Sequence, residues 1–113
     1  ISQWEPMGKH YVMRGGMAYR AFRADPAQGG RHLVEAGRLW TYAFFFNSQK
    51  STNYDGFRRA KDFIYQLLRP LNKAELAHVA RGVIEVENAI EQKGASLIRA
   101  FLKESFLWVE PSP

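Results

Sequence analysis

The chain has 113 residues, enough for one domain with its own hydrophobic core, and it contains no cysteine. That absence excludes disulfide bridges, thiolate metal sites and cysteine nucleophiles, and it fits a reducing compartment. The net charge of +5 is unevenly placed: residues 1–71 hold 11 Lys or Arg against five Asp or Glu, whereas residues 72–113 hold five against six. Such a segregated positive charge is typical of proteins that bind nucleic acid.

No stretch approaches the roughly 20 consecutive apolar residues of a membrane-spanning helix. The N-terminus also lacks a charged segment followed by an apolar one. We therefore expect a cytoplasmic protein with no membrane partner. Because the sequence begins with Ile1 rather than Met, we also expect it to be a piece of a longer protein.

The most basic and most ambiguous stretch is KHYVMRGGMAYRAFRADP, which follows an aperiodic N-terminal arm. The alternation over residues 9–14 predicts a short strand. Gly15-Gly16 is a recognised turn pair, so an intrachain hairpin is the competing interpretation. The following residues, MAYRAF, are poor in β-branched side chains, which favours a short helix over residues 16–24 instead.

Two helices are predicted in the middle of the chain. After a loop at 25–30, residues 31–46 and 54–69 show apolar positions at helical spacing, separated by a polar loop at 47–53. Pro70 ends the second helix. The apolar positions are Leu33, Ala36, Trp40 and Phe44 in the first helix, and Phe57, Ala60, Ile64, Leu67 and Leu68 in the second.

The strongest helix signal lies in the C-terminal third. Asn72 followed by Glu75 predicts a capping box. An apolar seam follows that suits packing along another helix, and it consists of Leu76, Val79, Val83, Val86 and Ile90. If the helix continues through Gly94 into residues 95–108, it reaches about 54 Å and needs a partner chain. If Gly94 breaks it, a helical hairpin forms; the cost of glycine inside a helix favours this break.

Together these elements predict a single, mainly α-helical domain over residues 1–113. It divides into an arm at 1–8, a basic β-α-α-α part at 9–71 and C-terminal helices at 72–113. Four to five helices follow a short N-terminal strand or hairpin.

The sequence contains no recognisable catalytic motif. The three histidines are far apart, and no zinc-binding motif, phosphate-binding loop or nucleophile elbow occurs. Glu85, Glu87 and Glu91 form the only carboxylate cluster, which we interpret as a solvated helix face. We expect no enzyme activity, no metal and no cofactor.

The order β-α-α over residues 9–46 is that of a ribbon-helix-helix unit, in which the strands of two chains pair and enter the DNA major groove. On the predicted strand Tyr11 and Met13 suit the core, so His10, Val12 and Arg14 form the reading face. The residues expected to contact DNA are Lys9, His10, Val12, Arg14, Arg20, Arg23, Arg31, Arg58, Arg59 and Lys61.

The segments GMAYRAF, GGRHLVEAGRLW and STNYDGFRRAKDFI resemble the layout of AcaB-like regulators of conjugative and integrative elements. The similarity spans roughly residues 10–69 and rests on element order and on aromatic and glycine positions. It implies a DNA-binding transcriptional activator with a ribbon-helix-helix-like element and further helices beyond it. The glycine pair directly after the predicted strand departs from that layout.

We therefore expect a DNA-binding transcriptional regulator that is homodimeric, with its basic N-terminal part on duplex DNA. The C-terminal helices would supply the core and the dimer seam, and other regulatory proteins would be further partners. The alternative is a non-catalytic helical interaction or inhibitor module of a mobile element, favoured by the aromatic run from Trp40 to Phe46 and by the apolar seam.

Overall fold

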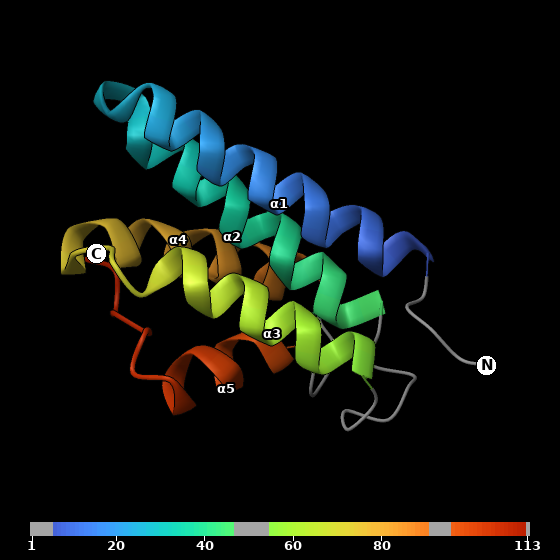
Figure 1. Ribbon diagram of the computed structural model, residues 1–113. Coiled ribbons are helices and arrows are strands. Elements are labelled where there is room, and N and C mark those ends of the chain that lie inside the picture. The colour runs from blue at the N-terminus through green and yellow to red at the C-terminus, as the bar shows by residue number, and fades with distance from the viewer. Residues whose placement is uncertain (1–5, 47–54, 91–95, 113) are drawn as a thin grey trace.

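The computed structural model describes residues 6–46, 55–90 and 96–112, and within these ranges it contains five α-helices and no strand (Figure 1). None of these helices has the length and apolarity needed to cross a membrane. The expected mainly α-helical fold is confirmed. The helices are α1 (Pro6–Ala24), α2 (Gly29–Phe46), α3 (Asp55–Leu68), α4 (Lys73–Ala89) and α5 (Leu97–Glu104), and a 3-10 turn at Pro26–Gln28 joins the first two.

The strand predicted over residues 9–14 is wrong, and so is the hairpin at Gly15-Gly16, because α1 runs through both. The short helix predicted over 16–24 is the second half of α1. Of the predicted arm, residues 1–5 lie outside the described residues and 6–8 form the first turn of α1. Pro6 stands at the first helical position, where its fixed φ and missing N–H are tolerated.

The glycine pair allows α1 to lie against α2 at close range. Gly15 is buried over the Trp40 side chain, and a β-carbon at Gly15 would overlap the indole ring. Trp40 is completely buried, and its Nε1 donates a hydrogen bond of 3.1 Å to the carbonyl oxygen of Val12. A carbonyl has two lone pairs, so it can accept this bond alongside its helical one. Gly15 therefore makes room for the indole, and neither glycine forms a turn.

Helix α2 is the centre of the fold and confirms the prediction for residues 31–46, beginning two residues earlier. It packs on α4 so closely that each helix places a glycine against the other's backbone: Gly37 meets the Val79 carbonyl, and Gly82 meets the Val34 carbonyl. Figure 1 shows α1 lying along α2, with α5 on the other side of α3. The large side chains of α2 with no exposed surface are Leu33, Trp40 and Phe44.

Helix α3 and the start of α4 form as predicted. The capping box is present: the Asn72 side chain accepts from the Glu75 N–H at 2.9 Å, and the Glu75 carboxylate accepts from the Asn72 N–H at 2.9 Å. In α3 the predicted inner positions are buried except Leu67, which is half-buried; the buried ones are Phe57, Ala60, Ile64 and Leu68.

The apolar seam of α4 is part of the chain's own core. Leu76, Val79, Val83 and Val86 are buried, and α4 packs on α2. The seam is therefore not available to a second chain, contrary to the expected dimer contact. Helix α4 ends at Ala89, so the continuous 36-residue helix is not formed; Gly94 itself lies outside the described residues.

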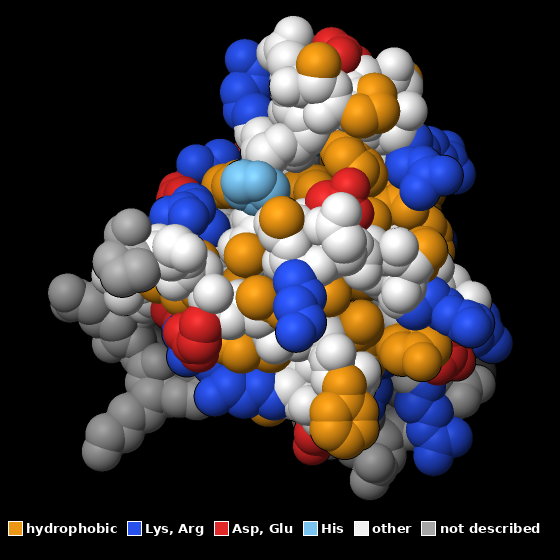
Figure 2. Space-filling model, turned by 90° about the vertical axis from the view of Figure 1, so that its left-hand side faces the viewer, with side chains coloured by type: hydrophobic (Ala, Val, Ile, Leu, Met, Phe, Trp, Pro, Cys, Tyr) orange, Lys and Arg blue, Asp and Glu red, His pale blue; other side chains and the backbone are white. Residues whose placement is uncertain are grey.

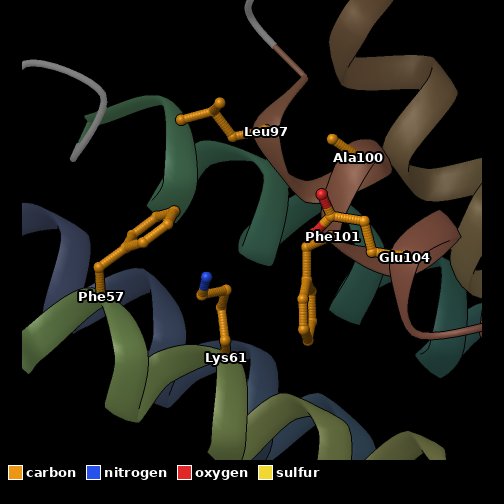
Figure 3. A pocket seen from close by; sticks show the side chains of 6 residues that line it. All are labelled: Phe57, Lys61, Leu97, Ala100, Phe101 and Glu104. Carbon is orange, nitrogen blue, oxygen red and sulfur yellow. The ribbon is translucent and has the colours of Figure 1, made fainter. Parts of the chain in front are cut away.

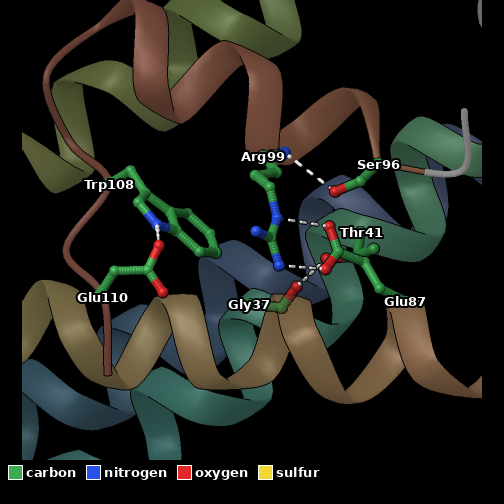
Figure 4. A network of polar contacts seen from close by, with 7 residues as sticks. All are labelled: Gly37, Thr41, Glu87, Ser96, Arg99, Trp108 and Glu110. Carbon is green, nitrogen blue, oxygen red and sulfur yellow. Dashed lines mark hydrogen bonds and ion pairs between the residues drawn. The ribbon is translucent and has the colours of Figure 1, made fainter. Parts of the chain in front are cut away.

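A network of polar contacts holds the C-terminal segment as far as Glu110 (Figure 4). Arg99 donates two hydrogen bonds to the Glu87 carboxylate, at 2.9 and 2.6 Å. The same guanidinium lies 4.5 Å from the centre of the Trp108 ring, whose Nε1 donates to Glu110 at 2.6 Å. Bidentate pairing and ring stacking are the strengths of arginine, so one side chain joins α4, α5 and the C-terminal segment.

The neighbouring glycines of α1 allow a matched test of this packing. We expect Gly15→Ala to lower the free energy of unfolding by about 1–3 kcal/mol, because the new methyl group overlaps a buried indole that cannot move. Gly16→Ala meets only the far end of the Phe63 ring, which is partly exposed. That variant should be neutral, or stabilised by up to about 1 kcal/mol through helix propensity.

Urea denaturation of both variants measures the difference. A hairpin at this position would make both substitutions destabilising, since a turn pair with positive φ at both residues strains alanine at either site. Equal losses in the two variants would therefore contradict the helical assignment.

Candidate nucleic-acid interface

Helix α1 carries four cations and no carboxylate along its whole length. Lys9, Arg14, Arg20 and Arg23 are all exposed, and so is His10. The face of α1 that packs on α2 is apolar, with Val12, Tyr19 and Phe22 buried. Burial of that face turns the charged side chains of the helix toward solvent.

None of the four α1 cations forms an ion pair with another described residue. Two of them lie against tyrosine rings of their own helix: the Arg14 guanidinium is 5.7 Å from the centre of the Tyr11 ring, and that of Arg23 is 6.0 Å from the Tyr19 ring. Arg23 also donates to the Tyr19 hydroxyl at 3.4 Å. Contacts with neutral rings orient a guanidinium but leave its positive charge uncompensated.

Arg38 of α2 and Arg99 of α5 contrast with the arginines of α1. Arg38 lies 2.7 Å from Glu85 and 2.9 Å from Glu35, and Arg99 is paired with Glu87. Hydrogen bonds to Glu85, and then to Glu35, raise the pKa of Arg38 above its ordinary value, and the bond to Glu87 does the same to the pKa of Arg99. These two cations are neutralised within the fold, whereas the four cations of α1 are not paired with any described carboxylate.

The α1 cations flank an apolar strip on the outer face of the helix. At 100° per residue, Lys9 and Arg20 lie about 20° apart around the axis and about 17 Å apart along it. His10 and Arg14 lie on the other flank. Between the flanks are Met13 and Met17, which are 59% and 65% exposed. The outer face of α1 is hereafter this strip with its two cationic flanks.

The predicted reading face of His10, Val12 and Arg14 does not exist as a unit. His10 and Arg14 share a flank of α1 because they are four residues apart on a helix. Val12 points the opposite way: it is buried, and its carbonyl holds the Trp40 indole. The pairing of Tyr11 and Met13 on one core face is also wrong, since Met13 is exposed while Tyr11 is half-buried, its ring 5.6 Å from that of Tyr42.

The structure divides the predicted α3 residues between two sides of that helix. Arg59 lines a small pocket of about 120 Å³ between α1 and α3, together with Lys9, so these two cations come together. Lys61 lines a different pocket, between α3 and α5, with its Nζ 5.0 Å from the centre of the Phe57 ring. Arg58 is exposed, as is Arg31 in the first turn of α2.

Exposed apolar side chains are the functional feature that the sequence analysis missed. Phe63, 38% exposed, lines the α1–α3 pocket beside Met13. A helical projection of residues 9–24 would have placed both methionines outside. Figure 2, which views the end of the molecule, shows Lys and Arg side chains mostly along the edges of that face, with hydrophobic side chains spread over its middle.

Within the described ranges, no group of three or more His, Cys, Asp or Glu side chains is arranged to hold a metal ion. The outer face of α1 itself offers positive charge and apolar contact. Comparison of the chain with family models, with curated proteins and with solved structures found no match.

Proposed function

We propose that this protein binds duplex DNA through the outer face of α1, as a transcriptional regulator. The observation that carries the proposal is the set of four exposed α1 cations that no described carboxylate neutralises. Lys and Arg that have no partner in a fold are available to replace the counterions of a phosphate backbone, and this exchange supplies most of the affinity for DNA.

The distribution of charge on α1 fits a helix in a groove. The DNA major groove, about 12 Å wide, admits an α-helix and has a row of phosphates along each edge. Cations on both flanks of the outer face would contact those phosphates. The strip between them, Met13 and Met17, would face the base edges, where apolar side chains contact the thymine methyl group.

The proposed DNA binding does not require a ribbon-helix-helix element. The positive charge of the basic N-terminal part supports it, and this charge lies on the surfaces of helices. The resemblance to AcaB-like regulators also implies DNA binding. It implies a two-stranded ribbon as the binding element, whereas we propose helix α1. Arg59, which lies beside Lys9 at the α1–α3 pocket, would extend the phosphate contacts onto α3.

Charge reversal on α1 tests this proposal against a matched control. We expect Arg20→Glu to weaken binding to a fluorescent random-sequence duplex by about tenfold and to reduce the slope of log affinity against log salt by about 1 or more. Arg81→Glu changes the net charge equally, but on an exposed position of α4. It should change the affinity by no more than about twofold.

Fluorescence anisotropy over a series of salt concentrations gives both quantities. No binding at low salt, or an affinity that does not depend on salt, would exclude the proposed function. Equal effects of the two reversals would show that only net charge matters and that α1 is not the interface.

A second function is favoured by one specific observation, the apolar α1–α3 pocket with cations at its rim. Val12, Met13, Ala60 and Phe63 line it, with Lys9 beside them. An amphipathic helix of another protein, with apolar anchors and acidic flanking residues, would complement this surface. In that case the chain would be an interaction module of the kind expected as the alternative.

The double substitution Met13→Gln and Met17→Gln separates the two functions, because it removes apolar surface and leaves every charge in place. For DNA binding we expect the affinity for a random duplex to stay within about threefold of the unchanged protein, since phosphate contacts dominate. For helix docking, binding to an acidic amphipathic test peptide should fall by about tenfold or more. Titrating both probes against both proteins decides between them.

A further inference from the structure

Phe106 combines two features that seldom occur together in an aromatic residue. Its side chain is 93% exposed, and its φ is +59°, in the left-handed region that favours glycine. It follows the C-cap of α5, with Leu107 N–H bonded to the Leu102 carbonyl at 2.8 Å and Phe106 N–H to the Lys103 carbonyl at 3.2 Å. These are the two bonds of a Schellman motif. Phenylalanine thus occupies a site where glycine would be less strained and would expose no ring.

The backbone that carries Phe106 is held on its C-terminal side as well. Leu107 is buried in the core, and Trp108 is stacked on Arg99, which is itself bound to Glu87. An aromatic ring on a fixed backbone loses little conformational freedom when it is bound, which is the property of an interface anchor.

A pocket suited to an aromatic ring lies nearby, between α3 and α5, with a volume of about 190 Å³. Figure 3 shows its lining side chains gathered around a common space, with the Lys61 ammonium between the Phe57 and Phe101 rings. A ring placed there would meet other rings and an ammonium over its face, which are favourable aromatic contacts. The lining residues are Phe57, Lys61, Leu97, Ala100, Phe101 and Glu104.

We propose that Phe106 of one copy enters the α3–α5 pocket of a second copy, and that two such contacts form a homodimer. The ring and four of the six pocket residues belong to α5 or directly follow it, so one two-fold axis makes both contacts at once, as an isologous interface requires. Antiparallel pairing of two α5 helices about Lys103 would place each Phe106 opposite Ala100. Ala100 is small and exposed, which permits close approach.

The charges of this face also favour a second copy over an unrelated partner. Lys61 and Glu104 both line the pocket, so a two-fold axis brings groups of opposite sign within reach of each other. The α4 seam is used within the chain and cannot serve as the dimer contact. This inference goes beyond the proposed DNA binding and does not depend on it.

The anchor is tested by Phe106→Gly in sedimentation equilibrium of the full chain. We expect the dimer dissociation constant to rise by about tenfold or more, because a central aromatic anchor is removed. At concentrations where both proteins are monomeric, the melting temperature should not fall, because glycine adopts the positive φ without strain. A wild-type chain that stays monomeric at about 100 μM would overturn the proposal, and so would a variant that dimerises as tightly as wild type.

The pocket is tested by Ala100→Glu, which adds a carboxylate to its wall beside Glu104. This variant should also be largely monomeric. An equimolar mixture of the two variants should form heterodimers, since the Phe106→Gly chain keeps its pocket and the Ala100→Glu chain keeps its ring. A mixture that contains only monomers would overturn the reciprocal contact.

Met17→Gln is the matched control, because it removes a similarly exposed apolar side chain from α1, away from α5. It should leave the dissociation constant of the dimer unchanged. A loss as large as that of Phe106→Gly would show general hydrophobic association and overturn the proposed interface. Phe106→Gly should still bind DNA with strong salt dependence, so failure of one proposal is distinguishable from failure of the other.

Discussion

The contact between the Trp40 indole and the backbone of α1 at Gly15 is the constraint on which the rest of the fold depends. A fully buried indole needs a partner for its N–H, and the Val12 carbonyl supplies it at 3.1 Å. That bond and the missing β-carbon of Gly15 together set the distance between α1 and α2. On another side of α2, Gly37 and Gly82 allow the backbones of α2 and α4 to approach each other directly. Glycines therefore set how closely both α1 and α4 pack on α2.

Because one face of α1 packs on α2, the two faces of this helix have separate roles. The face with Val12, Tyr19 and Phe22 covers α2, and the opposite face keeps every charge of the helix in water. Arg38 of α2 and Arg99 of α5 instead pair with the α4 carboxylates Glu85 and Glu87, and these ion pairs join the helices. The net charge of +5 thus understates the local field at α1, since α1 itself has no carboxylate and three carboxylates of other helices are already paired with Arg38 and Arg99.

Local signals in the sequence predicted α2, α3 and the start of α4 correctly. The capping box of Asn72 and Glu75 and the spacing of the α3 core residues involve only neighbouring positions. A short stretch of sequence is therefore enough to predict them. The first half of α1 was missed because residues 9–14 were interpreted as an alternating pattern, which suits a strand as well as one flank of a helix. Gly15 makes room for the side chain of Trp40, which lies 25 positions further along the chain. No pattern of neighbouring residues predicts that contact.

The candidate site was predictable in charge but not in arrangement. Most of the cations expected to contact DNA are exposed, since Lys and Arg are rarely buried without a partner. Which of them share a face depends on helical phase, and that is why Val12 was misplaced and the methionines were overlooked. The α4 seam shows the same limit: its periodicity indicates that a helix covers it but not whether that helix belongs to the same chain.

The C-terminal segment is attached by apolar packing and by polar contacts. Leu107 is buried in the core, Trp108 and Val109 pack against it, and Arg99 adds a bidentate ion pair and a cation–π contact. This attachment fixes the backbone on both sides of Phe106, which suits the anchor role that we propose for its ring. Figure 1 shows α5 and α1 on opposite sides of the molecule. A dimer formed through α5 would therefore leave both α1 helices facing outward, each with its unpaired cations available to a phosphate backbone.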